Sequence, residues 1–175
     1  MPHSITAILL KGDYSQEVAK EYELIGIKLD FDLTLFPIDH AFTAYWQAKL
    51  NITGHLETME SDDTLKIIFP DERVIYELLV KVTGRTKKLR FAIISTDYFG
   101  GVGTQIGNAY RGDEMIPLKL DSINEALKAL GVKRKRTGFL SRSDMDEFDT
   151  IGLGNIRSNP DYLDKYDELA DELGV

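Results

Sequence analysis

Apolar and polar residues repeat with two different periods along the chain, and each period predicts one kind of element. Ile5–Leu10 is a short apolar run that stops at Gly12, which predicts a first strand closed by a turn. Between Leu24 and Phe36 every odd position is apolar, whereas the even positions from Lys28 to Thr34 are polar. This alternation predicts one long strand with a buried face and a wet face.

Later segments carry the helical period of about 3.6 residues. Asp39 can cap a first helix, and Pro70-Asp71 starts a second one. Ser122 and Glu125 form a capping box for a third helix, and Pro160 lies at the start of the last one. The residues expected to face the core are Phe42, Tyr45, Trp46 and Leu50; Val74, Ile75, Leu78, Leu79 and Val82; Ile123, Ala126, Leu127 and Leu130; and Tyr162, Leu163, Tyr166, Leu169, Ala170 and Leu173.

The order of the elements predicts how the strands pair. Leu65–Phe69 and Leu89–Thr96 flank the second helix, and this succession predicts a parallel βαβ unit with a right-handed crossover. Thr104–Tyr110 and Glu114–Leu118 flank the turn signal Arg111-Gly112-Asp113, which predicts an antiparallel hairpin. We therefore expect one domain over residues 1–175. Its fold is a mixed α/β arrangement of two layers, with a mainly antiparallel sheet containing one βαβ unit and with helices on one face.

Composition excludes several classes of protein. The 175 residues are 43% hydrophobic and 29% charged, which is typical of a folded domain, and the absence of cysteine excludes disulfides and thiolate metal sites. The chain begins without a basic run and contains no stretch of about 18 apolar residues, which predicts a cytoplasmic protein that does not bind membranes. The formal net charge of −8 argues against a nucleic-acid partner.

Charged residues are distributed unevenly along the chain. Lys133–Arg136 is a run of basic residues, which we interpret first as a solvated helix exit and second as a site for an anion or a partner. The C-terminal segment from Asp161 to Glu172 is strongly acidic and contains the single basic residue Lys165. That segment favours solubility and attraction of a basic partner.

One motif suggests catalysis. Asp30-Phe31-Asp32-Leu33-Thr34 resembles the nucleophile motif of the haloacid dehalogenase superfamily of phosphotransferases. The resemblance implies that Asp30 attacks phosphorus, that Asp32 acts as general acid and base, and that Mg²⁺ offsets their charge. Candidates for the later motifs of that family are Ser95 or Thr96 and Lys133 or Lys135.

The surrounding pattern favours a different interpretation of this motif. The family places its acidic pair just beyond a buried parallel strand, whereas here Lys28 interrupts the apolar run and the alternation continues through both carboxylates. The family's final acidic pair would require an acid four residues after Asp113, but this position is Pro117. We therefore expect two carboxylates on the wet face of a sheet, and a Mg²⁺-dependent phosphatase is the alternative function.

A glycine-rich segment, Thr96–Gln105, follows an apolar strand directly. Glycines at such a place let backbone N–H groups approach a ligand, but the spacing is not the dinucleotide fingerprint and no lysine follows, so no nucleotide cofactor is expected. The other interpretation is a glycine-rich turn between two antiparallel strands. The candidate residues for binding a ligand or partner are Asp97, Tyr98, Phe99, Gly100, Gly101, Gly103 and Gln105. This segment, together with Glu147–Leu153, resembles stretches of small uncharacterised bacterial proteins.

No complete catalytic set appears in the sequence. His40 and His55 lack the spacing of metal ligands, so neither a metal site nor a cofactor is expected. An acidic surface and loop aromatics suit contact with another macromolecule. The sequence therefore predicts a non-catalytic binding or regulatory module that acts through protein partners. It leaves the partner, the oligomeric state and the role of Lys133–Arg136 open.

Overall fold

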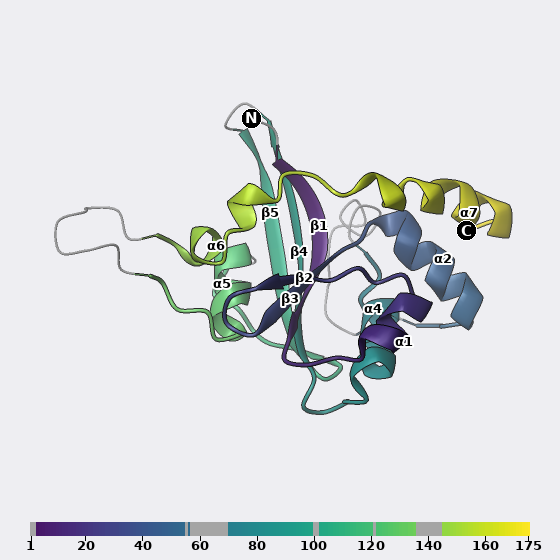
Figure 1. Cartoon of the computed structure of the whole chain (residues 1–175), viewed down its shortest axis with the longest axis horizontal. Helices are drawn as coiled ribbons and strands as arrows, with labels where there is room; N and C mark the ends of the chain where they lie inside the picture. Colours follow the sequence, from purple (N-terminus) through teal and green to yellow (C-terminus); the bar gives the residue numbers. More distant parts are fainter. Residues whose placement is uncertain (1–2, 55, 57–69, 100–101, 121, 136–144) are drawn as a thin grey trace.

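A six-stranded sheet forms the centre of the molecule, with neighbouring strands antiparallel in the order β2-β3-β1-β4-β5-β6 (Figure 1). The computed structural model describes residues 3–54, 56, 70–99, 102–120, 122–135 and 145–175. The strands are β1 His3–Lys11, β2 Ile27–Leu29, β3 Leu33–Pro37, β4 Arg90–Phe99, β5 Val102–Arg111 and β6 Glu114–Met115. The mixed α/β class and the mainly antiparallel sheet are confirmed.

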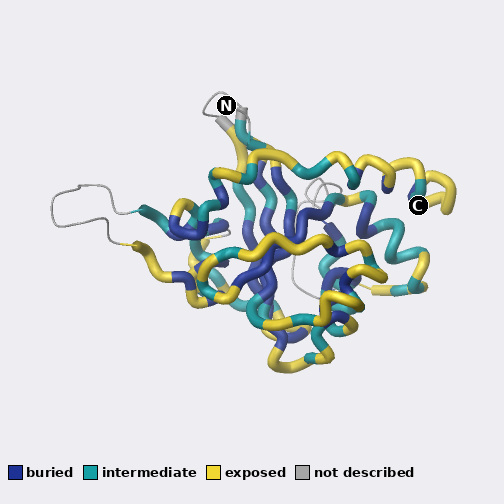
Figure 2. Tube along the Cα trace, in the orientation of Figure 1, coloured by how far each residue is buried: buried dark blue, intermediate teal, exposed yellow. Residues whose placement is uncertain are grey.

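Helices cover both faces of this sheet, which differs from the two-layer arrangement predicted. The first face is covered by α1 Gln16–Glu21, α2 His40–Leu50, α4 Glu72–Thr83 and α7 Lys165–Leu173, and the second by α5 Ile123–Ala129 and α6 Glu147–Thr150. In β1, Ile8 and Leu10 join the core under the first face, whereas Ala7 and Leu9 join the core under the second. Residues 7–10 of β1 are apolar at every position, so this part of the strand must be covered on both sides. Figure 2 shows the buried centre.

The segment predicted as one long strand is a hairpin. β2 and β3 pair antiparallel with Leu29 opposite Leu33, and Asp30-Phe31-Asp32 forms the turn, with positive φ at Phe31 and Asp32. The alternation does not reveal this turn, because paired residues differ by an even number of positions and therefore lie on the same face. The predicted wet face is also wrong at Thr34, which is fully buried.

The predicted helix starts are confirmed by their caps. The carboxylate of Asp39 accepts a hydrogen bond from the Phe42 backbone N–H at 2.7 Å, and that of Asp71 accepts one from Val74 at 3.1 Å. The Ser122 hydroxyl caps α5 in the same way. The expected apolar stripe of α4 is buried completely, and it consists of Val74, Ile75, Leu78, Leu79 and Val82.

The C-terminal segment packs against α2 and is not one continuous helix. A short 3-10 helix, η2, spans Asp161–Leu163 and precedes α7. The Tyr166 ring lies 4.9 Å from that of Phe42 and 5.3 Å from that of Tyr45, measured between centroids. Leu173, predicted to face the core, is 42% exposed.

β5 forms a hairpin with β6 and packs beneath the start of α5. The hairpin between β5 and β6 turns at Gly112-Asp113, as predicted. The start of α5 lies directly over β5, where a Cβ added to Gly107 would be 2.8 Å from the Ile123 Cα. The strand Leu65–Phe69 of the predicted βαβ unit lies outside the described residues.

We expect Gly107→Ala to destabilise the fold, because its methyl group would push α5 away from β5. Overpacking of this kind costs about 1–3 kcal/mol. Urea denaturation followed by circular dichroism measures the change. Gly154→Ala is the matched control, since a Cβ there would have ordinary contacts of 3.7 Å. Equal midpoints for the two variants would contradict close packing of α5 on Gly107.

Candidate binding surface

The residues predicted for binding lie at the outer end of the hairpin formed by β4 and β5. Phe99 pairs with Val102 across a two-residue connection, so the segment is a turn between antiparallel strands, as the second interpretation predicted. Asp97 faces Thr104, and both side chains are exposed. Tyr98 is half-buried and lies opposite Gly103. Gly100 and Gly101 lie outside the described residues.

Several groups of this segment serve the fold. The buried Thr96 hydroxyl accepts a hydrogen bond from the Ile5 N–H at 3.2 Å and lies 2.7 Å from Nδ1 of His3. The His3 ring lies 5.4 Å from that of Phe148, which ties the end of the sheet to α6. A Cβ on Gly103 would be only 2.0 Å from the Asp97 carbonyl oxygen, so glycine is required there by the chain's own backbone.

The two carboxylates of the phosphotransferase-like motif lie in the turn between β2 and β3. The Asp30 side chain is 63% exposed and forms an ion pair with Lys135 at 2.8 Å, while the Asp32 carbonyl accepts a hydrogen bond from Gly12. Ser95 and Thr96 lie further along the sheet. The Ser95 hydroxyl bonds that of Thr6, whereas the turn with the two carboxylates is bonded by Lys11. Thr6 and Lys11 are five residues apart on β1, which is a distance of about 17 Å. The structure therefore brings Lys135 to Asp30 but separates them from the expected second motif.

No group of three or more His, Cys, Asp or Glu residues with the geometry of a metal site occurs among the residues described. His40 is exposed at the first position of α2. His55 lies outside the described residues.

A row of cations crosses the sheet at the end opposite the β4–β5 turn. Arg90 and Arg111 are register partners on β4 and β5. Lys11 lies next to them at the end of β1 and on the same second face, because Leu10 pairs with Phe91. Like charges placed opposite each other across two strands destabilise a sheet. On its other side, Arg111 has the acidic residue Glu114 of β6 as its register partner.

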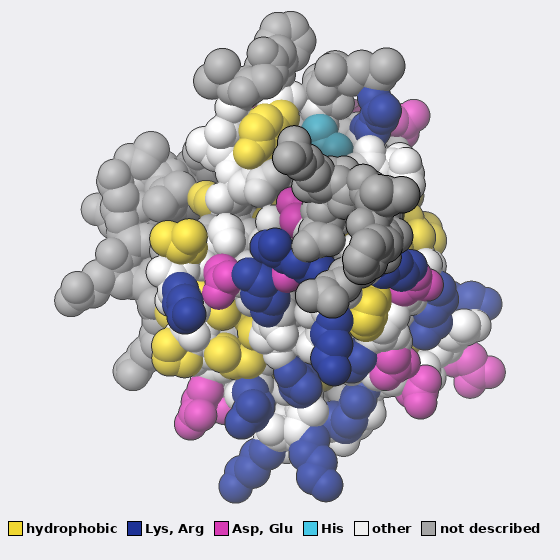
Figure 3. Space-filling view, turned by 90° about the vertical axis from the view of Figure 1, so that its left-hand side faces the viewer, with side chains coloured by type: hydrophobic (Ala, Val, Ile, Leu, Met, Phe, Trp, Pro, Cys, Tyr) yellow, Lys and Arg dark blue, Asp and Glu magenta, His cyan; other side chains and the backbone are white. Residues whose placement is uncertain are grey.

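Further basic residues surround this row, and together they form a surface that we call the basic face. Arg90 donates to the Ala129 carbonyl at the end of α5, which places Lys133–Lys135 beside the row. Figure 3 shows Lys and Arg side chains gathered over the centre and lower part of this side of the molecule. The residues of the basic face are Lys11, Arg90, Arg111, Lys128, Lys133, Arg134 and Lys135.

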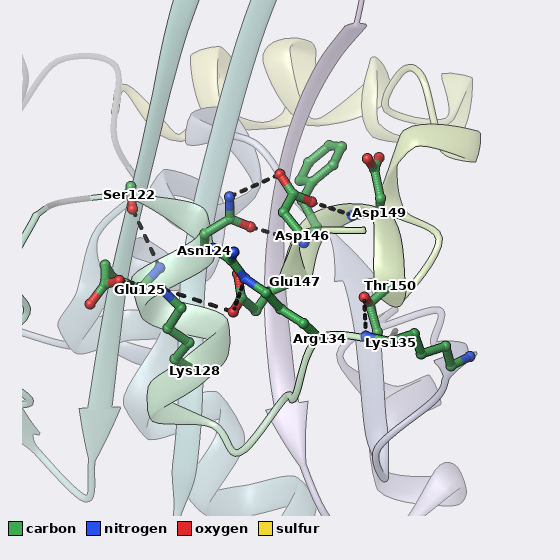
Figure 4. Close-up of polar contacts among 11 residues, drawn as sticks. Ser122, Asn124, Glu125, Lys128, Arg134, Lys135, Asp146, Glu147, Asp149 and Thr150 are labelled. Atoms are coloured by element: carbon green, nitrogen blue, oxygen red, sulfur yellow. Dashed lines mark hydrogen bonds and ion pairs between the residues drawn. The ribbon is translucent and has the colours of Figure 1, made fainter. Parts of the chain in front are cut away.

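A buried carboxylate, Glu147, holds two of these cations (Figure 4). Its Oε1 accepts a hydrogen bond from Nε of Arg134 at 3.0 Å and lies 3.9 Å from Nζ of Lys128, while the side chain is only 3% exposed. Its Oε2 is buried and has no hydrogen-bond partner among the described residues. The Lys128 ammonium also bonds Glu125 at 2.6 Å, and this hydrogen bond lowers the pKa of the Glu125 carboxyl.

Asn124 connects α5 with the start of α6 beside this carboxylate. Its amide nitrogen donates to the Asp146 carboxylate at 3.1 Å, and its amide oxygen accepts from the Phe148 N–H at 2.9 Å. Asp146 caps α6 through a bond of 2.9 Å from the Asp149 N–H. These contacts fix α6 against α5 and thereby position Glu147.

The acidic helix α7 lies on the opposite side of the molecule from α5 and α6 (Figure 1). Hydrogen bonds from Lys165 and Tyr166 lower the pKa of the Glu23 carboxyl. Burial and the Glu23 carboxylate raise the pKa of Tyr166 above its ordinary value. Burial, with smaller effects of Asp39 and Glu23, raises the pKa of Tyr162 to about 12.

Sequence reasoning missed two features of this surface. In the sequence, Glu147 belongs only to the stretch Glu147–Leu153 that resembles other proteins, although Asp146 before it is a helix-cap residue that signals a short helix. The row of Lys11, Arg90 and Arg111 has no local signal, because the three residues are far apart in the chain and become neighbours only through strand pairing.

Comparisons with known proteins found no matching family model, no matching curated protein and no matching solved structure. They therefore do not bear on the resemblances noted in the sequence. In the part of the chain that the structure describes, no helix is long and apolar enough to cross a membrane.

We expect Glu147→Gln to destabilise the protein by about 1–2 kcal/mol, because the neutral amide cannot replace the charge-assisted bond to Arg134. The loss stays modest because the Arg134 side chain is itself half-exposed. Chemical denaturation at neutral pH measures this loss. Glu125→Gln is the control, since its ion pair with Lys128 is at the surface and should contribute little. A larger loss for the control than for Glu147→Gln would overturn the anchoring role assigned to Glu147.

We expect stability to fall as the pH rises from 10 towards 12, partly through Tyr162. The folded state keeps its phenol protonated while the unfolded chain ionises near pH 10, so this contribution is complete below pH 10 and lost above it. Tyr162→Phe should flatten the decline, as measured by thermal denaturation at stepped alkaline pH. Tyr98→Phe, at the far end of the sheet, is the control, and identical slopes in both variants would refute the assignment.

Proposed function

We propose that this protein is a non-catalytic binding module of the cytoplasm that acts on a protein partner, with its basic face against an acidic surface of that partner. The observation that carries the proposal is the placement of Arg90 opposite Arg111 with Lys11 beside them. Such a row raises the energy of the free protein. An anionic partner would relieve the repulsion, and binding would gain from it.

The charge balance of the basic face supports this proposal. The carboxylates of Asp30, Glu125 and Glu147 compensate Lys135, Lys128 and Arg134. Within the described residues the other four cations have no carboxylate within ion-pair distance: Lys11 and Arg90 bond backbone carbonyls, and neither Arg111 nor Lys133 has an ion pair. Arg111 and Lys133 are exposed, and these two cations are therefore available to a partner's carboxylates.

The overall charge favours a protein over a nucleic acid as the partner. The chain carries a net charge of −8, and its acidic α7 lies away from the basic face. A long polyanion would meet this negative field over its whole length, whereas a protein with one acidic patch meets the basic face alone. Charge complementarity would also raise the association rate and make it sensitive to salt.

The test uses the intact protein as bait in a native cytosolic extract. We expect acidic proteins to be retained at low salt and released as the salt concentration rises. The double variant Arg111→Glu and Lys133→Glu should lose at least tenfold of the retained protein. The matched control is Lys20→Glu with Lys49→Glu, which changes the net charge equally at exposed positions outside the basic face.

Two results would overturn the proposal. Equal retention by the double variant and by its control would show that the basic face is not the contact, and retention abolished by nuclease would identify a nucleic acid. A Mg²⁺-dependent turnover of a phosphate ester that is lost in Asp30→Asn would instead support the alternative enzyme.

A further inference from the structure

The outer edge of β5 is open at the end of the sheet where the predicted binding residues lie. The Ala109 carbonyl points away from β4, because it accepts a hydrogen bond from Ile116 at 2.7 Å, and Arg111 pairs with β6. By the two-residue period of a strand, the N–H and C=O groups of Gly103, Gln105 and Gly107 point to the same side. None of these groups has a hydrogen-bond partner in the described parts of the chain.

This edge lacks the features that usually prevent strands from pairing with other chains. Residues 103–106 are Gly-Thr-Gln-Ile, with neither a charge nor a proline, and Gly103 and Thr104 are exposed. The opposite edge of the sheet differs, because β2 has only three residues and carries Lys28. An unprotected row of backbone donors and acceptors is a template for another strand.

We propose that a second copy of this chain pairs antiparallel with β5 around a two-fold axis at Thr104. Gly103 then faces Gln105 of the partner subunit, and Thr104 faces Thr104 of the partner subunit. In this register the outward groups of Gly103 and Gln105 form hydrogen bonds in both directions, and the two sheets become one continuous sheet. Threonines directly opposite each other are a favourable cross-strand pair.

The length of the open edge favours a copy of β5 over a foreign segment. Gly107 is buried beneath the start of α5, so an added strand cannot continue past it. A copy of β5 ends there by itself, because its first residue, Val102 of the partner subunit, faces Ile106. A longer extended segment of another protein would meet α5.

The charges near the axis permit this pairing despite the net charge of the chain. Among the β4 register partners of residues 103–106, the one acidic residue is Asp97, which lies one strand further in, opposite Thr104. The two copies of Asp97 are then three strand spacings apart, about 14 Å, which exceeds the Debye length of about 8 Å at physiological salt. Their repulsion is therefore largely screened.

Sedimentation velocity of the full chain over a concentration series tests the proposal. We expect the mass to rise from 19.8 kDa towards twice that value. Thr104→Lys, which places two ammonium groups at the axis, should keep the protein monomeric, as should Gln105→Pro, which removes an outward N–H donor. Ser4→Lys, exposed on the same face two strands away, is the control and should still dimerise.

Cysteine cross-linking tests the register, since the chain contains no cysteine of its own. Residues in a non-hydrogen-bonded pair have Cα atoms about 4.5 Å apart, which a disulfide can span. Thr104→Cys should therefore form a disulfide-linked dimer under mild oxidation, and Ser4→Cys should not. A chain that remains monomeric at every concentration, a dimer that survives Thr104→Lys, or cross-linking of Ser4→Cys alone would overturn the proposal. None of these results bears on the basic face.

Discussion

Burial of both faces of β1 and β4 is the constraint on which the rest of the structure depends. Ile8 and Phe91 lie under one set of helices, and Leu9 and Ala92 lie under the other. Because neither face of these strands can be left in water, the helices must be divided between the two sides of the sheet. The faces of the central strands are therefore committed to the core, and on the sheet itself the surfaces left for recognition are the ends and outer edges of the strands.

Both proposed contacts lie at such places. The cationic row of Lys11, Arg90 and Arg111 crosses the ends of three strands, and the open backbone of Gly103 and Gln105 is an outer edge. The row costs energy through repulsion, and the edge leaves backbone groups without partners in the described chain. Each is unfavourable in the isolated protein and becomes favourable in a complex.

The charged helices at the two sides of the molecule have different roles in stability. On α7 the acidic side chains lie at the surface, where ion pairs contribute little, and the buried Tyr166 among Phe42 and Tyr45 provides the packing. Near α5 the buried Glu147 anchors Arg134, so that this part of the basic face has a defined position. One buried carboxylate and the pairing of strands therefore fix the positions of basic side chains on the side of the molecule away from α7.

Local patterns in the sequence determined the helix starts at Asp39, Asp71 and Ser122, because a cap and an apolar stripe depend only on residues three or four positions apart. The period of two determined which residues of 27–35 share a face, but it is unchanged by the turn at Asp30–Asp32, so only tertiary pairing distinguished a hairpin from one strand. Tertiary structure also decided the cationic row and the open edge of β5. Both arise from which strands become neighbours, and that choice depends on contacts between residues distant in the chain.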